Sequence, residues 1–307
     1  MANLNQASTA ASSAGELAVQ LKDRAIDVWQ SRRFRRMVTA ILSHLILLFG
    51  ATIMVIPFIW MVSTSFKSPG MTFVYPPQWL PNPFVWQNYG EMWNALPFNF
   101  FFLNSVKIST LATLGQLISC SMSAFAFSIL KFRGRDQLFL ILIATLMVPY
   151  QVTLIPSFIL FSKIGWVNTH LPLWVPAFWG GAFGTFLIRQ FYLTIPIELA
   201  ESARIDGANI FQIFRYIYLP LSKPALATLA IFTFMWTWND LLSPLIYVNE
   251  LKRLTLTIGL SFFQNQYGGK WTLMMAGAVV SILPILLIFF FAQKYFIRGI
   301  AMTGIKR

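Results

Sequence analysis

Six long apolar runs alternate with shorter polar segments along this chain of 307 residues. A helix that crosses the hydrocarbon core of a bilayer needs about 20 mainly apolar residues, and each of these runs is long enough. The runs lie roughly at 37–66, 101–130, 138–161, 173–193, 225–248 and 273–297. The pattern predicts an all-α membrane protein with six transmembrane helices.

The composition is that of a protein whose solvent is partly lipid. The chain is 57% hydrophobic and 11% charged, whereas a soluble domain carries about 25% charged residues. Its net charge of +13 does not indicate nucleic-acid binding, because the basic residues lie between the apolar runs instead of gathering on one soluble face. We therefore expect a multi-pass protein of the cell (inner, or cytoplasmic) membrane.

The positions of the basic residues predict the orientation of the spans. If the N-terminus lies inside, seventeen Lys and Arg residues fall on the cytoplasmic side, five fall outside and Lys107 lies within a span. Because cytoplasmic segments carry an excess of Lys and Arg, both termini are expected to be cytoplasmic. The polar stretch 198–220 then faces the cytoplasm as well.

Motifs for catalysis or nucleotide binding are missing from the sequence. There is no G-x-x-x-x-G-K-[ST] phosphate loop and no G-x-S-x-G elbow. His44 and His170 are the only histidines, and they lie far apart with no cysteine cluster to complete a metal site. Cys120, the single cysteine, lies in an apolar run and is interpreted as a packing residue. The chain is therefore predicted to be no enzyme and to hold no cofactor or metal of its own.

Residues 198–220, ELAESARIDGANIFQIFRYIYLP, form a charged interruption between two apolar runs. Gly207 permits the positive φ that ends a helix, so two short helices are expected, with Glu201 and Arg204 as a surface pair on the first. Pro220 and Pro224 are expected to end the second helix before the fifth span. The apolar residues predicted to face inward are Leu199, Ala200 and Ala203 on the first helix and Ile210, Ile213, Phe214 and Ile217 on the second.

The spacing within this stretch resembles the E-A-A-x3-G-x9-I-x-L-P signature of ABC-importer permeases. Ser202 stands where the signature has its middle alanine, and serine is small enough to keep the fit. In that family this helix pair fits a cleft of an ATPase subunit and transmits its closure to the spans. The resemblance assigns the ATPase-coupling role to Glu201, Ser202, Ala203, Asp206, Gly207, Ile217, Leu219 and Pro220.

Five further strings resemble the smaller permease subunits of carbohydrate importers of the maltose type. They are MVPYQVTLIP at 147–156, GWVNTH at 165–170, FGTFLIRQFY at 183–192, TWNDLLSPLIYV at 237–248 and GIAMTGIKR at 299–307. The resemblance, which covers about residues 36–307, implies a type I ABC-importer permease fold. It also implies a second permease subunit in a heterodimer, two cytoplasmic ATPase subunits that bind the ATP and Mg, and an extracytoplasmic sugar-binding protein.

With this resemblance the chain divides into four parts. Residues 1–36 form a basic cytoplasmic leader whose Ala/Ser-rich start is expected to be disordered, and residues 17–36 form either an amphipathic surface helix or a solvated tail. The first transmembrane helix and an external loop fill 37–100, and that loop is interpreted as an aromatic belt or as a docking surface. The permease core follows at 101–297, with coupling helices at 196–220, and a cytoplasmic tail ends the chain at 298–307.

A substrate pathway is predicted within spans three to five, where aromatic faces and short polar groups suit a carbohydrate. For any single tryptophan, packing or lipid contact is the alternative. Asp240 is expected about eight residues inside the outer end of the fifth span, at a depth where Lys107 can pair with it, unless Lys107 reaches the surface by itself. The predicted pathway residues are Tyr150, Gln151, Trp179, Trp238, Asn239 and Asp240.

Other functions remain open from the sequence. An ion-coupled carrier working alone would need ionisable relays within the membrane, and only Lys107 and Asp240 are clear candidates. A membrane enzyme is disfavoured by the missing motifs, and an importer permease could also carry an amino acid or an ion. Stimulation of a partner ATPase would indicate a permease, whereas transport by this chain alone would indicate a carrier.

Overall fold

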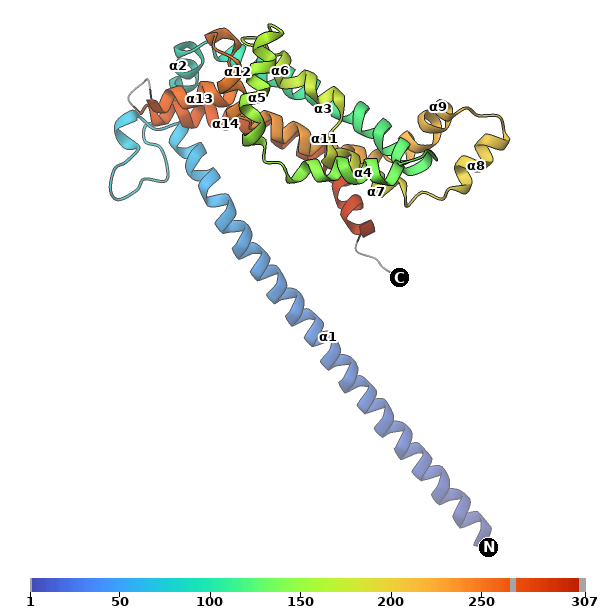
Figure 1. Cartoon of the computed structure of the whole chain (residues 1–307). Coiled ribbons are helices and arrows are strands. Elements are labelled where there is room, and N and C mark those ends of the chain that lie inside the picture. Colours follow the sequence, from blue (N-terminus) through green and yellow to red (C-terminus); the bar gives the residue numbers. More distant parts are fainter. Residues whose placement is uncertain (1, 266–268, 304–307) are drawn as a thin grey trace. The chain divides into compact units, whose positions relative to one another are not determined.

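The computed structural model describes residues 2–265 and 269–303 (Figure 1). Helices account for most of these residues, and the described ranges contain no β-strand. The prediction of an all-α protein is confirmed. The chain divides into two compact units, Met1–Trp60 and Met61–Arg307.

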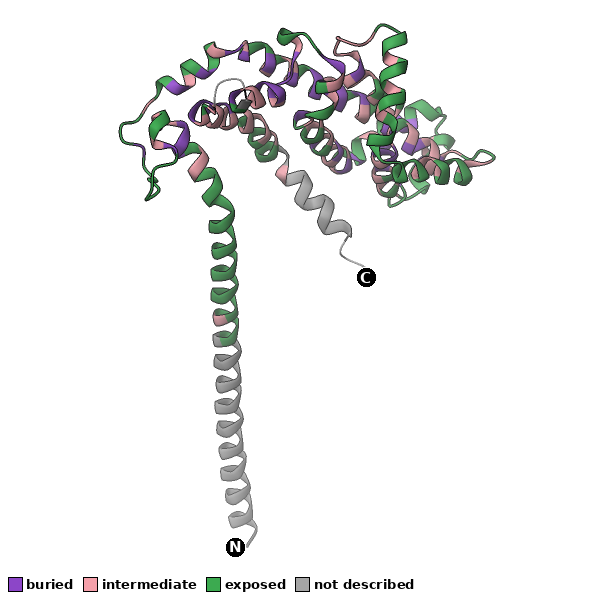
Figure 2. Ribbon diagram, turned by 60° about the vertical axis from the view of Figure 1, so that its left-hand side comes forward, coloured by how far each residue is buried: buried purple, intermediate pink, exposed green. Residues whose placement is uncertain are grey.

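The first unit consists of helix α1 up to Trp60. The helix begins at Ala2 and ends at Ser65, so its last five residues belong to the second unit. The expected disorder at the start of the leader is wrong, because α1 already includes this segment. Its residues explain the helix: the leader contains no proline and is rich in Ala and Arg, with several Leu and Gln, all of which favour helices. From Met37 to Ile59 almost every side chain is exposed (Figure 2), as expected for an apolar helix whose solvent is lipid.

The second unit contains the remaining helices, most of them short and separated by tight breaks. Its α-helices are α2 (Gln87–Ala95), α3 (Phe98–Ile129), α4 (Arg135–Ala144), α5 (Tyr150–Lys163), α6 (Leu171–Trp174), α7 (Ala182–Tyr192), α8 (Glu198–Ile205), α9 (Ile210–Ile213), α10 (Leu219–Leu221), α11 (Lys223–Trp238), α12 (Leu242–Tyr247), α13 (Leu256–Asn265) and α14 (Trp271–Thr303). Short 3-10 turns are η1 (Pro69–Met71), η2 (Thr145–Met147), η3 (Val175–Trp179) and η5 (Leu251–Arg253), and η4 (Phe214–Tyr218) is a π-helical turn.

Within the described residues, four segments are long and apolar enough to cross a membrane singly, and two bent helix pairs bring the number to six. The predicted number of spans therefore holds if each bent pair contributes one crossing, which for the second pair is its longer helix Lys223–Trp238. The tail predicted at 298–307 begins inside α14, and residues 304–307 lie outside the described residues. The four single segments are Arg35–Ser65, Phe98–Ile129, Leu171–Tyr192 and Trp271–Phe291.

The third and fifth spans are not continuous helices. The third is broken before α5, where Arg135–Met147 and Tyr150–Lys163 meet at 98°. Proline explains this break, since Pro149 has no N–H to donate and disfavours helical backbone at the preceding residue. The fifth span was predicted to reach residue 248, but α11 ends at Trp238 and α12 begins at Leu242.

Two buried clusters hold the second unit together, and α3 passes through both. The first contains Phe98 and Phe101 of α3 with Trp238, Leu256 and Phe263 from the later helices. The second joins α3, α7 and α11 to the segment 200–218. Figure 2 shows the buried residues where these helices meet.

The second cluster depends on a close approach between helices. A Cβ on Gly184 would lie 2.7 Å from Cys120 Sγ, so only glycine lets α7 come this near to α3. Cys120 itself is fully buried in this contact. Its predicted packing role is confirmed.

Candidate functional site

The polar stretch after α7 folds as a helical hairpin, formed by α8, α9, η4 and α10 (residues 198–221). Its turn is a Schellman cap: the Gly207 N–H donates to the Arg204 carbonyl at 3.1 Å, and the Ala208 N–H donates to the Ala203 carbonyl at 2.9 Å. Gly207 has φ +84°, and an added Cβ would meet no atom within 4 Å. The positive φ predicted for Gly207 is confirmed, and its reason is backbone conformation, not crowding.

The second helix of the hairpin begins with a reciprocal cap. The Gln212 N–H donates to Asn209 Oδ1 at 2.9 Å, and the Asn209 N–H donates to Gln212 Oε1 at 2.8 Å. At the far end the chain turns by 76° between Ile210–Leu221 and Lys223–Trp238. The predicted end of this helix before the fifth span is confirmed.

The underside of the hairpin packs on the spans. Ala200 and Tyr218 are fully buried, and Ile213 is 1% exposed. The Tyr218 ring lies 5.2 Å from the rings of both Phe125 in α3 and Tyr192 in α7. A displacement of the hairpin must therefore carry α3 and α7 with it, since close-packed interiors transmit strain.

Two apolar residues do not face where the sequence predicted. Leu199 is 44% exposed and Ile210 is 53% exposed, whereas both were expected on the inward side. Ala200 is instead the α8 residue that is buried in the second cluster. The inward positions predicted for Ala200, Ile213 and Phe214 are confirmed, and Ala203 and Ile217 are half-buried.

The outer face of the hairpin combines exposed charges with large exposed apolar side chains. Ile205 is 88% exposed, Tyr216 72% and Phe211 65%, and sequence reasoning assigned none of them to this face. Large exposed apolar side chains among charged ones are typical of a protein-docking site. Of the residues assigned to coupling, Glu201, Ser202, Asp206, Gly207 and Pro220 are exposed, and Ala203, Ile217 and Leu219 are half-buried.

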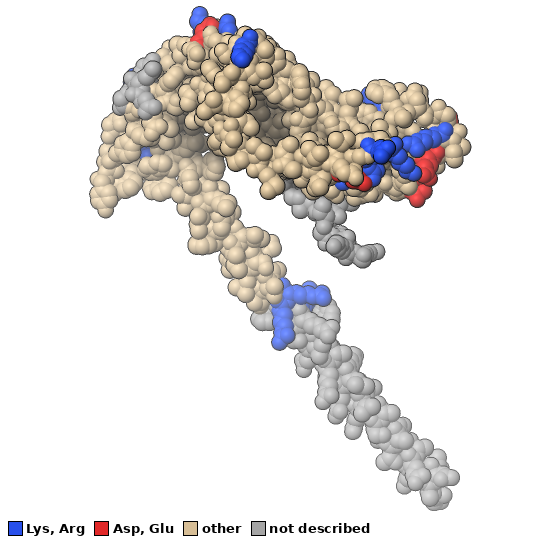
Figure 3. All heavy atoms as spheres, viewed as in Figure 1, with Lys and Arg blue, Asp and Glu red and all other residues tan. Residues whose placement is uncertain are grey.

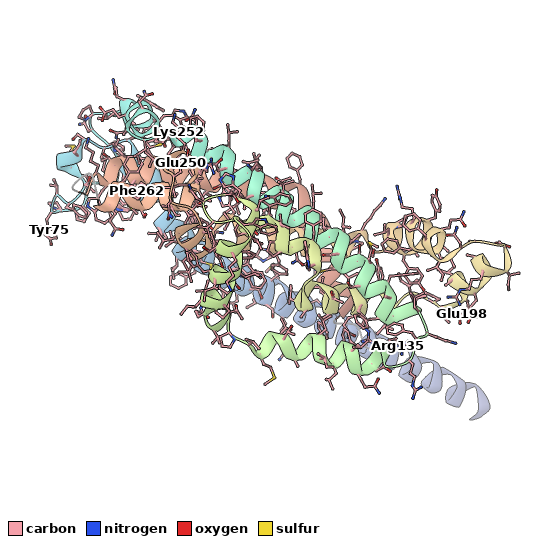
Figure 4. All side chains as sticks on the ribbon, turned by 45° about the horizontal axis from the view of Figure 1, so that its top comes forward. Tyr75, Arg135, Glu198, Glu250, Lys252 and Phe262 are labelled. Atoms are coloured by element: carbon pink, nitrogen blue, oxygen red, sulfur yellow. The ribbon has the colours of Figure 1, made fainter. Side chains whose placement is uncertain are left out.

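The charged residues of the second unit gather at two opposite ends. Glu198 and Arg135 lie at the hairpin end, and Glu250 and Lys252 lie at the other (Figure 4). On the face shown in Figure 3, the surface between these groups carries almost no charged side chain. This is the charge distribution of a protein that crosses a bilayer. The predicted surface pair of Glu201 and Arg204 is not among the ion pairs of the described residues.

A second candidate region consists of the helix breaks inside the spans. Tyr150 and Gln151 begin α5 directly after the Pro149 break, and Trp179 ends η3 before Gly180 at φ +92°. Asn239 and Asp240 lie in the break between α11 and α12. Non-helical backbone at membrane depth is tolerated where it lines a water-filled cavity or is buried in protein. All six predicted pathway residues thus lie next to breaks, since Trp238 is the last residue of α11.

The sixth predicted pathway residue, Trp238, is the last residue of α11 before the same break, but its side chain is buried. It is 3% exposed, its Nε1 donates to the Ser281 carbonyl at 3.1 Å, and its ring stacks on Phe234. It belongs to the first buried cluster. The Trp238 side chain is therefore part of the core, whereas none of the other five is buried.

An aromatic cavity of about 400 Å³ adjoins the break after α11. Asn239 supplies its polar group: its Nδ2 donates to the Met235 carbonyl at 2.8 Å, which leaves Oδ1 as an acceptor. Trp179, which is 77% exposed, is not part of its wall. Phe183, Phe232 and Met235 were missed by sequence reasoning, because nothing in a linear apolar run marks which members face a cavity. The lining residues are Phe183, Phe232, Met235, Trp236 and Asn239.

Asp240 and Lys107 do not form the pair that the sequence predicted. The ion pairs of the described residues do not include one between them. The break after Trp238 is the reason, since it frees Asp240 from the helix and lets its Oδ1 accept from the Ser243 N–H at 3.1 Å. Ser243 Oγ in turn lies 2.9 Å from Tyr150 Oη, so this cap joins α5 to α12.

We expect the role of Asp240 to depend on its cap more than on its charge. Asp240→Asn keeps an acceptor for the Ser243 N–H and should leave thermal stability nearly unchanged. Asp240→Ala removes the acceptor and should cost about 1 kcal/mol. Thermal unfolding of the purified chain in detergent checks this, with Asp206→Ala as the control for an exposed aspartate. Equal losses for both Asp240 variants would contradict the cap.

The described residues offer no obvious place for a metal ion, since no group of three or more His, Cys, Asp or Glu side chains gathers there. The hairpin likewise presents no phosphate-binding loop. The arrangement suits binding rather than catalysis. The hairpin offers a surface for a partner protein, and the helix breaks offer polar groups inside the spans.

Comparison with known proteins gives consistent matches over most of the chain. The sequence profile of the family described as "Binding-protein-dependent transport system inner membrane component" matches residues 117–302, more than half of the chain. The osmoprotective compounds uptake permease protein GgtD of Synechocystis sp. is 37% identical over 221 residues, covering 71% of this chain and 74% of that protein. The arabinooligosaccharides transport system permease protein AraQ of Halalkalibacterium halodurans is 34% identical over 284 residues, covering 89% and 99%.

Solved structures include a similar fold. A chain of a bacterial ABC transporter involved in the import of the acidic polysaccharide alginate matches with a TM-score of 0.75 and 25% sequence identity. The match covers 84% of this chain and 96% of that chain. The hairpin and the broken spans described above thus lie within a fold known from a transporter.

Proposed function

This chain belongs to the family of binding-protein-dependent transport system inner membrane components and is a permease subunit of an ABC importer, and we propose that it forms half of the translocation pathway for a carbohydrate. It is a multi-pass membrane protein with the type I permease fold. The family's function is transport and not catalysis. ATP and Mg are assigned to partner subunits, because the sequence has no phosphate-binding loop.

The hairpin at residues 198–221 carries this proposal. Its exposed apolar face, with Ile205, Phe211 and Tyr216, supplies a docking surface for a cytoplasmic ATPase subunit, and its buried face is fixed to α3 and α7. Closure of two ATPases on ATP would move the hairpin, and the contact of Tyr218 with Phe125 and Tyr192 would pass that movement to the spans. The expected assembly contains a second permease subunit, two ATPases and an extracytoplasmic binding protein.

The orientation follows from the same assignment. If the hairpin docks an ATPase, its end of the second unit is cytoplasmic, and the end that carries Glu250 and Lys252 is extracytoplasmic (Figure 4). The excess of basic residues on the hairpin side supports the same direction. Both termini are then cytoplasmic.

Carbohydrate is the substrate class that the comparisons favour. The printed names of AraQ and of the alginate transporter refer to an oligosaccharide and a polysaccharide. The aromatic cavity with Asn239 suits the C–H faces and hydroxyls of a sugar. A carrier that works alone through an intramembrane Lys107–Asp240 relay receives no support, because the described residues contain no such ion pair.

Reconstitution in proteoliposomes tests the proposal. We expect uptake of labelled oligosaccharide only when this chain, its permease partner, the ATPases and the binding protein are present with internal ATP. Glycerol phosphate, amino acids and inorganic ions serve as competing substrates. Uptake by this chain alone, driven by an ion gradient, would show a secondary carrier and overturn the proposal.

A further inference from the structure

A second polar cavity lies at the end of the unit opposite the hairpin, and the proposed transport role does not use it. Its volume is about 360 Å³. Three segments form it: α3 contributes Lys107, η5 contributes Arg253, and α6 with the two residues before it contributes the rest. The lining residues are Lys107, Thr169, His170, Leu171, Trp174 and Arg253.

The charges around this cavity do not cancel. Arg253 Nε lies 2.8 Å from Glu250 Oε2, and Arg253 also donates to the Asn168 carbonyl, so its charge is matched. Lys107 has no carboxylate partner among the ion pairs of the described residues. The cavity wall thus carries one unmatched positive charge.

His170 is the second polar group that faces this space. Its Nε2 lies 2.8 Å from the Arg253 carbonyl, and because a carbonyl only accepts, Nε2 must carry the proton. Burial, together with the positive charges of Lys107 and Arg253, lowers the pKa of His170, so the ring is neutral at neutral pH. Its Nδ1 then remains able to take up a proton.

The Thr169 hydroxyl has its own local partners. It donates to the Trp166 carbonyl at 2.6 Å and accepts from the Leu171 N–H at 3.2 Å. Trp174 is engaged edge-on with Phe178, with ring centroids 5.9 Å apart, and forms an aromatic wall. Lys107 and His170 are therefore the groups left to meet a ligand.

We propose that this cavity binds one oxyanion, a carboxylate or phosphate group, held by Lys107 and next to His170. A single negative charge matches the single unmatched cation. An anion beside His170 also opposes the effect of Lys107 and Arg253 on the ring, so binding raises the pKa of His170 and strengthens as the pH falls. Glu250, already paired with Arg253, is the acidic group that η5 and its flank bring near.

Two sources can present this chemistry, a free anionic solute and the headgroup of a phospholipid. The chain has only two histidines, His44 and His170, so imidazole NMR of histidine-labelled protein gives two signals. The full chain, purified without a polyhistidine tag, is placed in phosphatidylcholine nanodiscs and titrated with inorganic phosphate at constant ionic strength. A parallel sample uses nanodiscs containing phosphatidylglycerol and no phosphate. His44→Gln assigns the remaining signal to His170.

The expected result is a saturable shift of the His170 signal toward its protonated position, with no change for His44. A shift in the phosphate titration identifies a free anion, and a shift in the phosphatidylglycerol sample identifies a headgroup. Lys107→Gln should weaken the response about tenfold or more, the loss expected for a charged hydrogen bond, whereas Lys252→Gln, on the same flank, should change it less than about twofold. No His170 shift in either sample, or a shift unaffected by Lys107→Gln, would overturn the proposal.

Discussion

Replacing Gly207 by proline is expected to abolish the substrate-stimulated part of ATP hydrolysis in the assembled transporter, while the chain still inserts and assembles. Gly207 sits at φ +84°, and proline fixes φ near −65°. Proline also removes the N–H that donates to the Arg204 carbonyl at 3.1 Å. The turn that directs α8 and α9 to one partner surface is then lost. Glu201→Lys, which reverses an exposed charge on the same face, should act in the same direction.

An alanine pair separates the coupling role from backbone strain. Gly134, in the turn before α4, has φ +83° and, like Gly207, no atom within 4 Å of an added Cβ. Alanine at either glycine must therefore adopt the same left-handed backbone conformation, which destabilises the folded state by about 1–2 kcal/mol. Measured in reconstituted complexes, Gly207→Ala should reduce stimulated ATPase activity and Gly134→Ala should not. Wild-type stimulation in Gly207→Pro would falsify the coupling assignment.

The number of spans was predictable from the sequence, but not every break within them was. An apolar run indicates that its residues lie within the membrane. The six runs correspond to the four single helices and two bent helix pairs that are long and apolar enough to cross it. Whether a run is one helix depends on single residues. Pro149 breaks the third run at 98°, and the fifth run breaks after Trp238 although 239–243 contains no proline. Mean hydropathy is taken over a whole run, so it does not reveal either break.

The hairpin was predictable for a different reason. Its turn is specified locally by Gly207 and by the reciprocal cap of Asn209 and Gln212, so a short sequence contains the whole signal. The division of its apolar residues is not local. Ala200 is buried and Leu199 is exposed because of where α3 and α7 lie, and periodicity alone cannot tell which of two neighbours meets another helix.

The predicted pairing of Asp240 with Lys107 was wrong because the break in the fifth run was not foreseen. Placed on a continuous helix, Asp240 would lie within the membrane and need a cation, which made Lys107 the natural partner. Placed in a break, it finds the Ser243 N–H instead. The half-buried Asp240 accepts from an N–H in the first turn of α12, and that N–H is free only because the preceding helix stops.

Removing the polar group of the aromatic cavity should weaken transport more than it weakens assembly. Asn239→Ala removes the Oδ1 acceptor and the hydrogen bond to the Met235 carbonyl, and a lost hydrogen bond to a sugar hydroxyl costs about 0.5–1.5 kcal/mol. Trp236→Ala removes an exposed aromatic face on the same wall. Each change should raise the sugar concentration for half-maximal uptake by about three- to tenfold, measured as initial rates in proteoliposomes.

Two further alanine variants decide how far the pathway extends. Asn249→Ala removes an exposed asparagine that is not part of the cavity wall and should leave uptake unchanged. Trp179→Ala changes the break before Gly180, which lies outside this cavity but on the predicted pathway. A loss equal to that of Asn239→Ala would mean that both breaks line one path. If Asn239→Ala and Trp236→Ala instead keep wild-type rates and half-saturation, sugar does not pass this cavity, and the aromatic wall must serve packing against another helix.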